Sequence, residues 1–175
     1  MRINQALVWT SVFMLLGLGI NVKTGITASM LQVTSPAFSP NGKIPVKYTC
    51  SGEDINPPLS IRGIPEGTKT LVLIMDDPDA PMGTWVHWVV YNIPPVEIIG
   101  ENSVPGQQAL NSFGKIDYGG PCPPSGTHRY FFKVYALDTS LTPSSKWAKA
   151  DVVKAMKGHV LAEAELIGLF SRSRP

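Results

Sequence analysis

Short apolar runs separated by glycine and proline turns are the feature that most restricts how this chain can fold. Three runs, TLVLIMDD (70–77), TWVHWVVYNIP (84–94) and RYFFKVYALD (129–138), are rich in the β-branched and aromatic residues that favour strands. The 175 residues include 16 glycines and 16 prolines, and helical patterns do not alternate with these runs. The pattern predicts a mainly β fold built as an antiparallel sheet or sandwich.

Three other segments predict further elements. IPVKYTC (44–50) alternates between apolar and polar residues and predicts a strand that ends in a turn. SSKWAKADVVKAMKG (144–158) offers a serine N-cap, good helix formers and a closing glycine, which predicts one helix of about three turns. HVLAEAELIGLFS (159–171) has a composition that suits a helix, but its alanines and glutamates alternate, which favours a strand.

The first 28 residues predict a secretory signal peptide. Arg2 precedes an uncharged apolar run, 6–20, that is too short for a comfortable membrane span. A polar stretch follows and ends in small residues at 27–29, although Ile26 stands where a small residue is preferred for cleavage. The start of the chain therefore indicates export with removal of this segment.

We therefore expect residues 1–28 to be a cleaved signal peptide and residues 29–175 to form one domain. The mature protein would be periplasmic or secreted, with no stable membrane span. Two alternatives stay open: the segment is retained as an anchor, or Met30 is the true initiator and the protein is cytoplasmic.

The charge of the chain argues against nucleic acid as a main partner. The sequence has 15 lysines and arginines against 13 aspartates and glutamates. These charges are dispersed, with neither a basic stripe nor a run of like charges. Binding to nucleic acid needs clustered positive charge that neutralises phosphates, so this class of partner is not expected.

The chain has two cysteines, Cys50 and Cys122, and neither belongs to a CxxC pair. A zinc ribbon is therefore unsupported. In an exported protein two cysteines most simply form one disulfide, which would close a long loop. Two buried free thiols are the alternative.

Two aspartates follow the apolar run at 70–77 in the sequence DDPDAP. Asp77 and Asp79 flank Pro78, and Pro81 follows, so two fixed φ angles hold both carboxylates in a stiff loop. Carboxylates held in this way at the end of a buried strand suit a binding site. A surface turn, in which aspartate and proline simply end the strand, is the alternative.

Two histidines lie in or beside predicted strands. His87 shares a strand face with Val89 and Tyr91 if the strand alternates regularly, and a satisfied core histidine is the alternative to a functional one. His128 and Arg129 stand at a loop–strand junction that could receive an anion, while Arg129 could instead form a structural salt bridge with an aspartate. Together with the aspartates, these residues suit a small pocket with a polar floor.

With these residues, the sequence resembles the phosphatidylethanolamine-binding proteins, in particular their bacterial, Raf-kinase-inhibitor-like branch. The resemblance extends from Met30 to Phe170. It rests on five motifs: YTCSGEDINPPLSI, DDPDAP, GTWVHWVVYNIP, GGPCPPSGTHRYFFKVYALD and KGHVLAEAELIG. The family resemblance implies an antiparallel β-sandwich with a few short peripheral helices.

The resemblance also implies a ligand pocket for phosphate-bearing headgroups and other small anions. The residues that it assigns to the pocket are Asp77, Asp79, Trp85, His87, Pro124, His128 and Tyr130. Within this set it puts Asp77 on the floor of the pocket and gives Asp79, with Arg129, a more structural role. This chain departs from the eukaryotic pattern in the very short MGT loop after DDPDAP and in the reduced C-terminal helix.

The function expected from the sequence is binding of a small anion, phosphate or phospholipid headgroup, with no metal, cofactor or catalytic residue. The sequence lacks HExxH spacing, a GxSxG nucleophile elbow and a P-loop, which argues against an enzyme. The second candidate is a protein-interaction module that inhibits a kinase or protease. A protonated histidine should bind phosphate better, so affinity should rise as pH falls through about 6.5.

Overall fold

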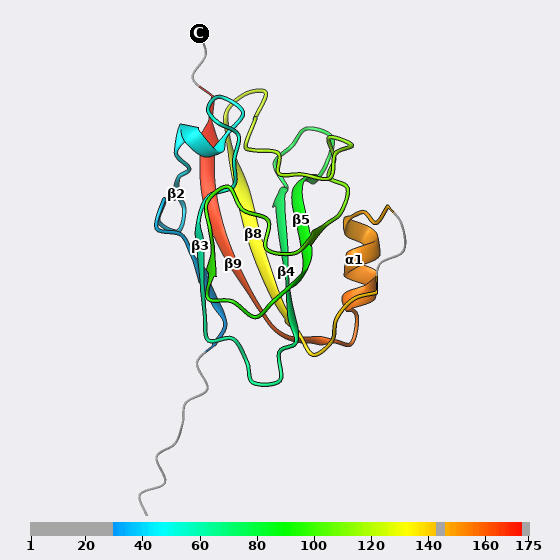
Figure 1. Cartoon of the computed structure of the whole chain (residues 1–175). Helices are drawn as coiled ribbons and strands as arrows, with labels where there is room; N and C mark the ends of the chain where they lie inside the picture. The colour runs from blue at the N-terminus through cyan, green and yellow to red at the C-terminus, as the bar shows by residue number, and fades with distance from the viewer. Residues whose placement is uncertain (1–29, 143–145, 173–175) are drawn as a thin grey trace, which may run out of the picture.

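The computed structural model describes residues 30–142 and 146–172. Two sheets form a sandwich in this part of the chain (Figure 1), and they are antiparallel except where β2 pairs with β9 in parallel. The three-stranded sheet has the order β1 (Gln32–Thr34), β3 (Leu59–Arg62), β6 (Ile98–Ile99). The six-stranded sheet has the order β2 (Gly42–Lys43), β9 (Val160–Ser171), β8 (Thr127–Leu137), β4 (Thr70–Asp77), β5 (Trp85–Ile93), β7 (Gln107–Gln108). The mainly β prediction is confirmed.

Strand β4 is buried along its whole length because both of its faces are covered. Leu71, Leu73 and Met75 point between the sheets into the main core. Val72 and Ile74 point to the opposite face, where α1 (Lys149–Met156) closes a second, smaller core. Figure 1 shows α1 beside β4 and β5, away from the three-stranded sheet. The continuous apolar run at 70–77 is therefore typical of a strand that is packed on both faces.

The C-terminal segment forms the longest strand, and its alternation explains why. In β9, residues 162, 164, 166, 168 and 170 face β1 and the main core, while Glu163 and Glu165 face solvent. Strand β9 pairs with β8 over eleven register positions from Thr127↔Ser171 to Leu137↔Val160. The strand prediction for this segment is confirmed, because period-2 burial outweighed its helical composition.

One local prediction was wrong, and another was right about the helix but not about its length and cap. Residues 46–48 of the expected strand at 44–50 form a 3-10 helix, η1 (Val46–Tyr48), because Pro45 enters it with φ −58° and has no N–H for a strand ladder. Helix α1 has eight residues and no serine cap; instead the Asp151 carboxylate accepts the N–H of Ala148 at 2.9 Å. The helix nevertheless ends at the expected glycine, Gly158, which takes φ +84°.

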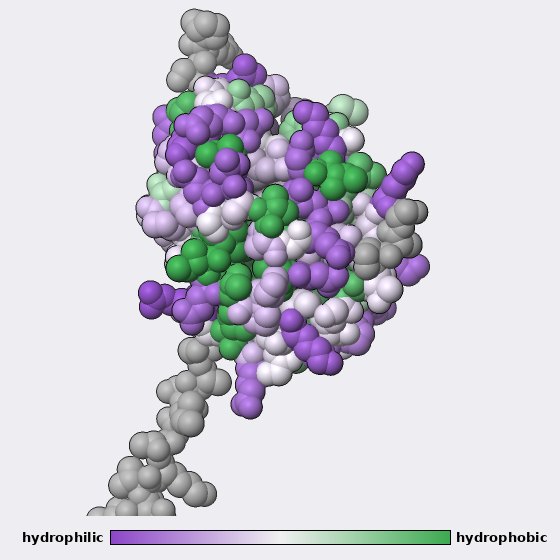
Figure 2. Space-filling model, in the orientation of Figure 1, coloured by the Kyte–Doolittle hydropathy of each residue, from purple (hydrophilic) through white to green (hydrophobic). Residues whose placement is uncertain are grey.

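None of the helices in residues 30–142 and 146–172 combines the length and hydropathy of a membrane span. The proposed signal peptide at 1–28 lies outside the described residues, so its cleavage stays a prediction. In Figure 2 the face that carries the three-stranded sheet shows apolar residues in separate patches among hydrophilic ones.

Cys50 and Cys122 form the disulfide that the sequence predicted, with their Cα atoms 5.5 Å apart and a sequence separation of 72. The bond joins the turn after η1 to the loop that precedes β8. A backbone hydrogen bond from Cys50 N to Pro121 O, 3.2 Å, runs beside it. Two distant loops are therefore held together at one end of the sandwich.

We expect removal of this disulfide by Cys50→Ser with Cys122→Ser to lower the free energy of unfolding by about 4 kcal/mol, the loop-entropy value for a closed loop of this length. Urea denaturation of the variant and of the wild type, with and without a dithiol reductant, measures the effect. The reduced wild type should match the variant. A loss below about 1 kcal/mol would show that the two loops hold each other without the bond.

Candidate functional site

The predicted site residues gather at the end of the sandwich where β4 ends and β5 and β8 begin. Asp77, the last residue of β4, pairs with Trp85, the first residue of β5. A cavity of about 200 Å³ opens there, lined by Asp77, Ala80, Pro81, Trp85, His87, Phe113, Cys122 and Pro124. Four of the seven residues predicted for ligand binding thus line one cavity, and the other three lie directly behind or beside it.

A β-bulge in β5 aims His87 at this cavity. Met75 pairs with Trp88 and Asp76 pairs with Val86, so His87 is the extra residue between them. As a result Val86 packs on the α1 side while Trp88 points into the main core, against the regular alternation that the sequence analysis assumed. The prediction that His87 shares a face with Val89 and Tyr91 was therefore wrong. Bulges commonly redirect a side chain in this way near binding sites.

The His87 imidazole is buried and fixed by its neighbours. Its Nδ1 lies 2.6 Å from the Gly119 carbonyl oxygen, so Nδ1 carries the proton and donates it. Its ring packs edge-on against Tyr130, with the centroids 5.2 Å apart. Burial lowers the pKa of His87 below 6.5, and the Gly119 carbonyl opposes that shift only in part. A neutral His87 therefore has Nε2, a hydrogen-bond acceptor, left for a ligand.

Asp77 and His128 form a buried pair at the floor of the cavity. His128 Nδ1 donates to Asp77 Oδ2 at 2.7 Å, and both residues are almost fully buried. The second oxygen, Oδ1, accepts the backbone N–H of Asp79 at 2.8 Å, which closes the tight turn that begins the DPDAP loop. Asp77 reaches the cavity wall, and His128 stands behind it, so His128 influences the site through the carboxylate.

Asp79 turns away from the cavity to bind Arg129. Its two oxygens accept hydrogen bonds from Arg129 Nη2 at 2.7 Å and Nε at 2.9 Å, and Oδ2 also accepts the Arg129 backbone N–H at 2.9 Å. The Arg129 side chain thereby lowers the pKa of Asp79 to about 2. This contact ties the DPDAP loop to the start of β8, which is the structural alternative considered for Arg129 and the role that the resemblance implied for Asp79.

Tyr130 contributes an unsatisfied polar atom. The residue is fully buried, and its hydroxyl is the buried side-chain nitrogen or oxygen atom in residues 30–142 and 146–172 that lacks a hydrogen-bond partner. Burial, and next the charge of Asp77, raise the pKa of Tyr130, so the hydroxyl keeps its proton. It lies near Asp77 and the Cys122 backbone without bonding geometry to either. A buried O–H without an acceptor costs about 1–3 kcal/mol, which a ligand oxygen would recover.

Two important residues were missed by the sequence analysis. Phe113 lies in a polar turn, NSFGK, yet its ring packs edge-on against Trp85 and His87 with centroid distances of 5.4 Å in each case. Asn111 is buried, and its side chain holds this turn through five hydrogen bonds. The only available signal was a large aromatic residue in a stretch of turn formers.

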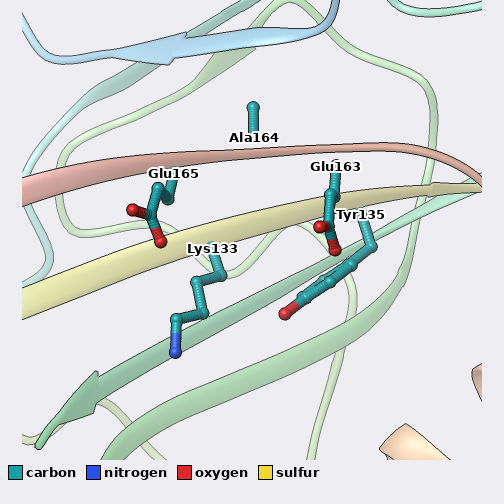
Figure 3. A pocket seen from close by; sticks show the side chains of 5 residues that line it. All are labelled: Lys133, Tyr135, Glu163, Ala164 and Glu165. Atoms are coloured by element: carbon teal, nitrogen blue, oxygen red, sulfur yellow. The ribbon is translucent and has the colours of Figure 1, made fainter.

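A separate hollow of about 320 Å³ lies on the outer face of β8 and β9 (Figure 3), and none of the predicted site residues lines it. Lys133, Tyr135, Glu163 and Glu165 point into it, while Ala164 points to the opposite face. The Lys133 ammonium is engaged with the buried Asp76, at 3.0 Å from Oδ1. We interpret this surface as a solvated sheet face rather than as the functional site.

We expect His87 to stay neutral at pH values below the one at which an exposed histidine titrates. Burial disfavours the imidazolium, so the midpoint of its titration should lie below 6.5. ¹H–¹⁵N NMR of the imidazole nitrogens across pH 4–8 measures this midpoint. Above it, the spectra should show that Nδ1 carries a proton and that Nε2 does not. A His87 midpoint at or above 6.5 would contradict the burial argument.

Comparison with known proteins identifies the family. The family model for phosphatidylethanolamine-binding protein matches residues 34–171. A protein of Methanothermobacter thermautotrophicus described as UPF0098 is 51% identical over 150 residues, covering 81% of this chain and 99% of its own. A Pyrococcus abyssi protein with the same description is 48% identical over 173 residues, covering 92% of this chain and 95% of its own.

Solved structures lead to the same family. A phosphatidylethanolamine-binding protein homologue from Chlamydia trachomatis is 44% identical with a TM-score of 0.80, covering 82% of this chain and 99% of its own. Escherichia coli YbcL, described as a member of the mammalian PEBP family, is 32% identical with a TM-score of 0.76, covering 83% of this chain and 100% of its own. The chain belongs to the phosphatidylethanolamine-binding protein family.

Proposed function

We propose that this protein binds small phosphate-bearing molecules, either free or as a lipid headgroup, in the cavity floored by Asp77 and His87. The observation that carries the proposal is the buried Tyr130 hydroxyl, which has a proton to donate and lacks an acceptor in the described part of the chain. Phosphate oxygens are strong acceptors, and the Tyr130 hydroxyl is a donor close to Asp77, whose side chain lines the cavity. The family to which the chain belongs supports the same class of ligand.

Anion binding at this site requires uptake of a proton. The Asp77 carboxylate lies in the cavity wall and repels an anion, and His87 and His128 each use Nδ1 to donate to a protein acceptor. The Nε2 atom of His87, which lines the cavity, donates to a ligand only when the ring is protonated. A protonated His87 would bond the anion directly, while His128 stands behind Asp77 and donates to its carboxylate. We therefore infer that phosphate and protons bind together.

We assign the site to binding rather than to catalysis. The cavity wall includes one cysteine, Cys122, whose sulfur is in the disulfide and so is not a nucleophile. Within the residues that the structure describes, three or more histidine, cysteine or acidic side chains do not come together as metal ligands would. These features support a binding role for this site.

Inhibition of a kinase or protease is the other candidate that the sequence raised. The proposed export makes a protease or another extracytoplasmic protein the more plausible target than a cytoplasmic kinase. The cavity gives the two functions different signatures, because a small phosphate ligand depends on Tyr130 and His128 while a protein surface contact does not.

We expect calorimetric titration with inorganic phosphate and with phosphorylethanolamine at pH 6 to show binding to the wild type. Tyr130→Phe removes only the hydroxyl and should weaken binding about tenfold, the usual effect of one buried hydrogen bond to a charged group. His128→Ala should abolish binding, because the charge of Asp77 is then uncompensated. His159→Ala is the matched control and should bind as the wild type does.

Equal binding by the wild type and both pocket variants would rule out this cavity as the site. A folded wild type that binds neither ligand would favour the protein-interaction function, which capture of the same protein target by the wild type and by Tyr130→Phe would then support.

We expect affinity for sulfate to rise as pH falls. Sulfate keeps both charges from pH 4 to pH 8, so only the protein titrates. Burial lowers the pKa of His87 in the ligand-free protein, and a bound anion should raise it. Affinity should therefore increase as pH falls from the His87 pKa of the complex to the lower His87 pKa of the free protein. Below that second pKa the affinity should stay constant. Titration at half-unit steps in buffers of different ionisation enthalpy measures the proton uptake. A flat profile from pH 5 to pH 8 would contradict the coupling.

A further inference from the structure

Phe113 stands between two cavities that share its side chain as a wall. On one side is the cavity of about 200 Å³ that contains Asp77 and His87. On the other is a smaller one of about 90 Å³, lined by Cys50, Asp54, Phe113, Lys115, Asp117, Tyr118, Gly119, Gly120 and Cys122. Cys122 is the other residue common to both. The Phe113 ring therefore acts as a partition within what would otherwise be a longer space.

The turn that carries Phe113 is held rigidly. Asn111 Oδ1 accepts the backbone N–H groups of Phe113 and Lys115, each at 3.0 Å. Asn111 Nδ2 donates to the Asp117 carbonyl at 3.0 Å and lies 3.4 Å from the His87 carbonyl. A single buried side chain thus fixes both ends of the turn and anchors it to the bulged part of β5.

The position of the Phe113 ring requires a glycine at residue 119. A Cβ atom added to Gly119 would lie 2.6 Å from Phe113 Cε2 and 2.8 Å from Cδ2, which is closer than real Cβ contacts. The Gly119 backbone is also bonded to His87 in both directions, through Gly119 N to His87 O at 3.1 Å and His87 Nδ1 to Gly119 O at 2.6 Å. The glycine therefore lets the loop bond to His87 and leaves room for the ring.

We propose that Phe113 is a specificity-determining residue that restricts the site to compact phosphates by closing the cavity at the far side of His87. This proposal rests on the proposed function and adds the size of the ligand to it. The open cavity is below the roughly 300–1,000 Å³ of sites for drug-sized ligands, in keeping with a small group. Inorganic phosphate, or a headgroup presented with its substituents directed out of the mouth, fits this space.

Phe113 is 42% exposed, but its ring contacts Trp85 and His87, and moving the ring to admit a substituent would break both contacts. Displacing it would expose the edges of Trp85 and His87 and break the packing on both, and each such aromatic pair is worth about 0.5–1.5 kcal/mol beyond its buried area. A phosphate monoester whose alkyl chain points inward meets the ring instead of a cavity. Without the ring, the same chain would reach the smaller cavity, where Tyr118 and the disulfide are apolar walls and Asp54, Lys115 and Asp117 are polar ones.

The test is a series of phosphates of increasing alkyl length, from inorganic phosphate through methyl, ethyl and butyl phosphate, titrated into the wild type and Phe113→Ala. In the wild type we expect affinity to stay flat or fall with chain length. In Phe113→Ala we expect it to rise with chain length, by at most about fourfold for each methylene that packs against Tyr118 and the disulfide. The ratio of affinities for butyl and inorganic phosphate is the readout, since Phe113 itself lines the site.

Gly119→Ala provides a second route to the same result, because it displaces the ring without removing it. It should change the chain-length profile in the direction of Phe113→Ala. Ile98→Ala, an exposed apolar residue on β6 of the other sheet, is the control and should keep the wild-type profile. Thermal unfolding of each variant checks that it is folded.

The outcomes separate the two claims. Identical chain-length profiles in the wild type and in both folded variants would overturn the role of Phe113 while leaving phosphate binding intact. A wild type that already gains affinity with chain length would overturn it as well. Failure of the wild type to bind any member of the series would overturn the proposed function, and with it this inference.

Discussion

The β-bulge at His87 is the constraint on which the rest of this site depends. A regular strand would place His87 under α1 beside Val89, where it would be one more buried side chain in the smaller core. The extra residue between Val86 and Trp88 turns the imidazole to the space between the sheets instead. Only there can it donate to Gly119, pack on Tyr130 and support the ring of Phe113.

Loops from distant parts of the chain then close the site, and each is held by a bond of a different kind. The disulfide fixes the loop before β8, the Asp79–Arg129 ion pair fixes the DPDAP loop, and Asn111 fixes the turn of Phe113. The two sheets supply only the floor. Since loops at the end of a sandwich have few backbone partners, such ties are what make a preformed cavity possible there, and a preformed cavity loses less conformational entropy on binding.

The sequence predicted the layers of the fold better than the details of the site. The continuous apolar residues of TLVLIMDD identified β4, because a strand buried on both faces needs apolar side chains at every position. The alternation in 159–171 identified β9, because a strand buried on one face needs them only at every second position. The orientation of His87 could not be predicted, since a bulge arises from register between two strands and leaves no local pattern. Phe113 was missed for a related reason: its partners Trp85, His87 and Gly119 are separated from it in sequence.

The acidic floor is the least expected property of a site proposed for anions, and it has a physical use. A cavity lined with permanent positive charge would hold any anion at any pH. Here the fixed charge is the carboxylate of Asp77, and the positive charges appear only when imidazoles take up protons. Under the proposed function, such a site would bind anions weakly while His87 is neutral and more tightly once its ring is protonated. Burial of His87 lowers its pKa, so the fold would shift anion binding to lower pH.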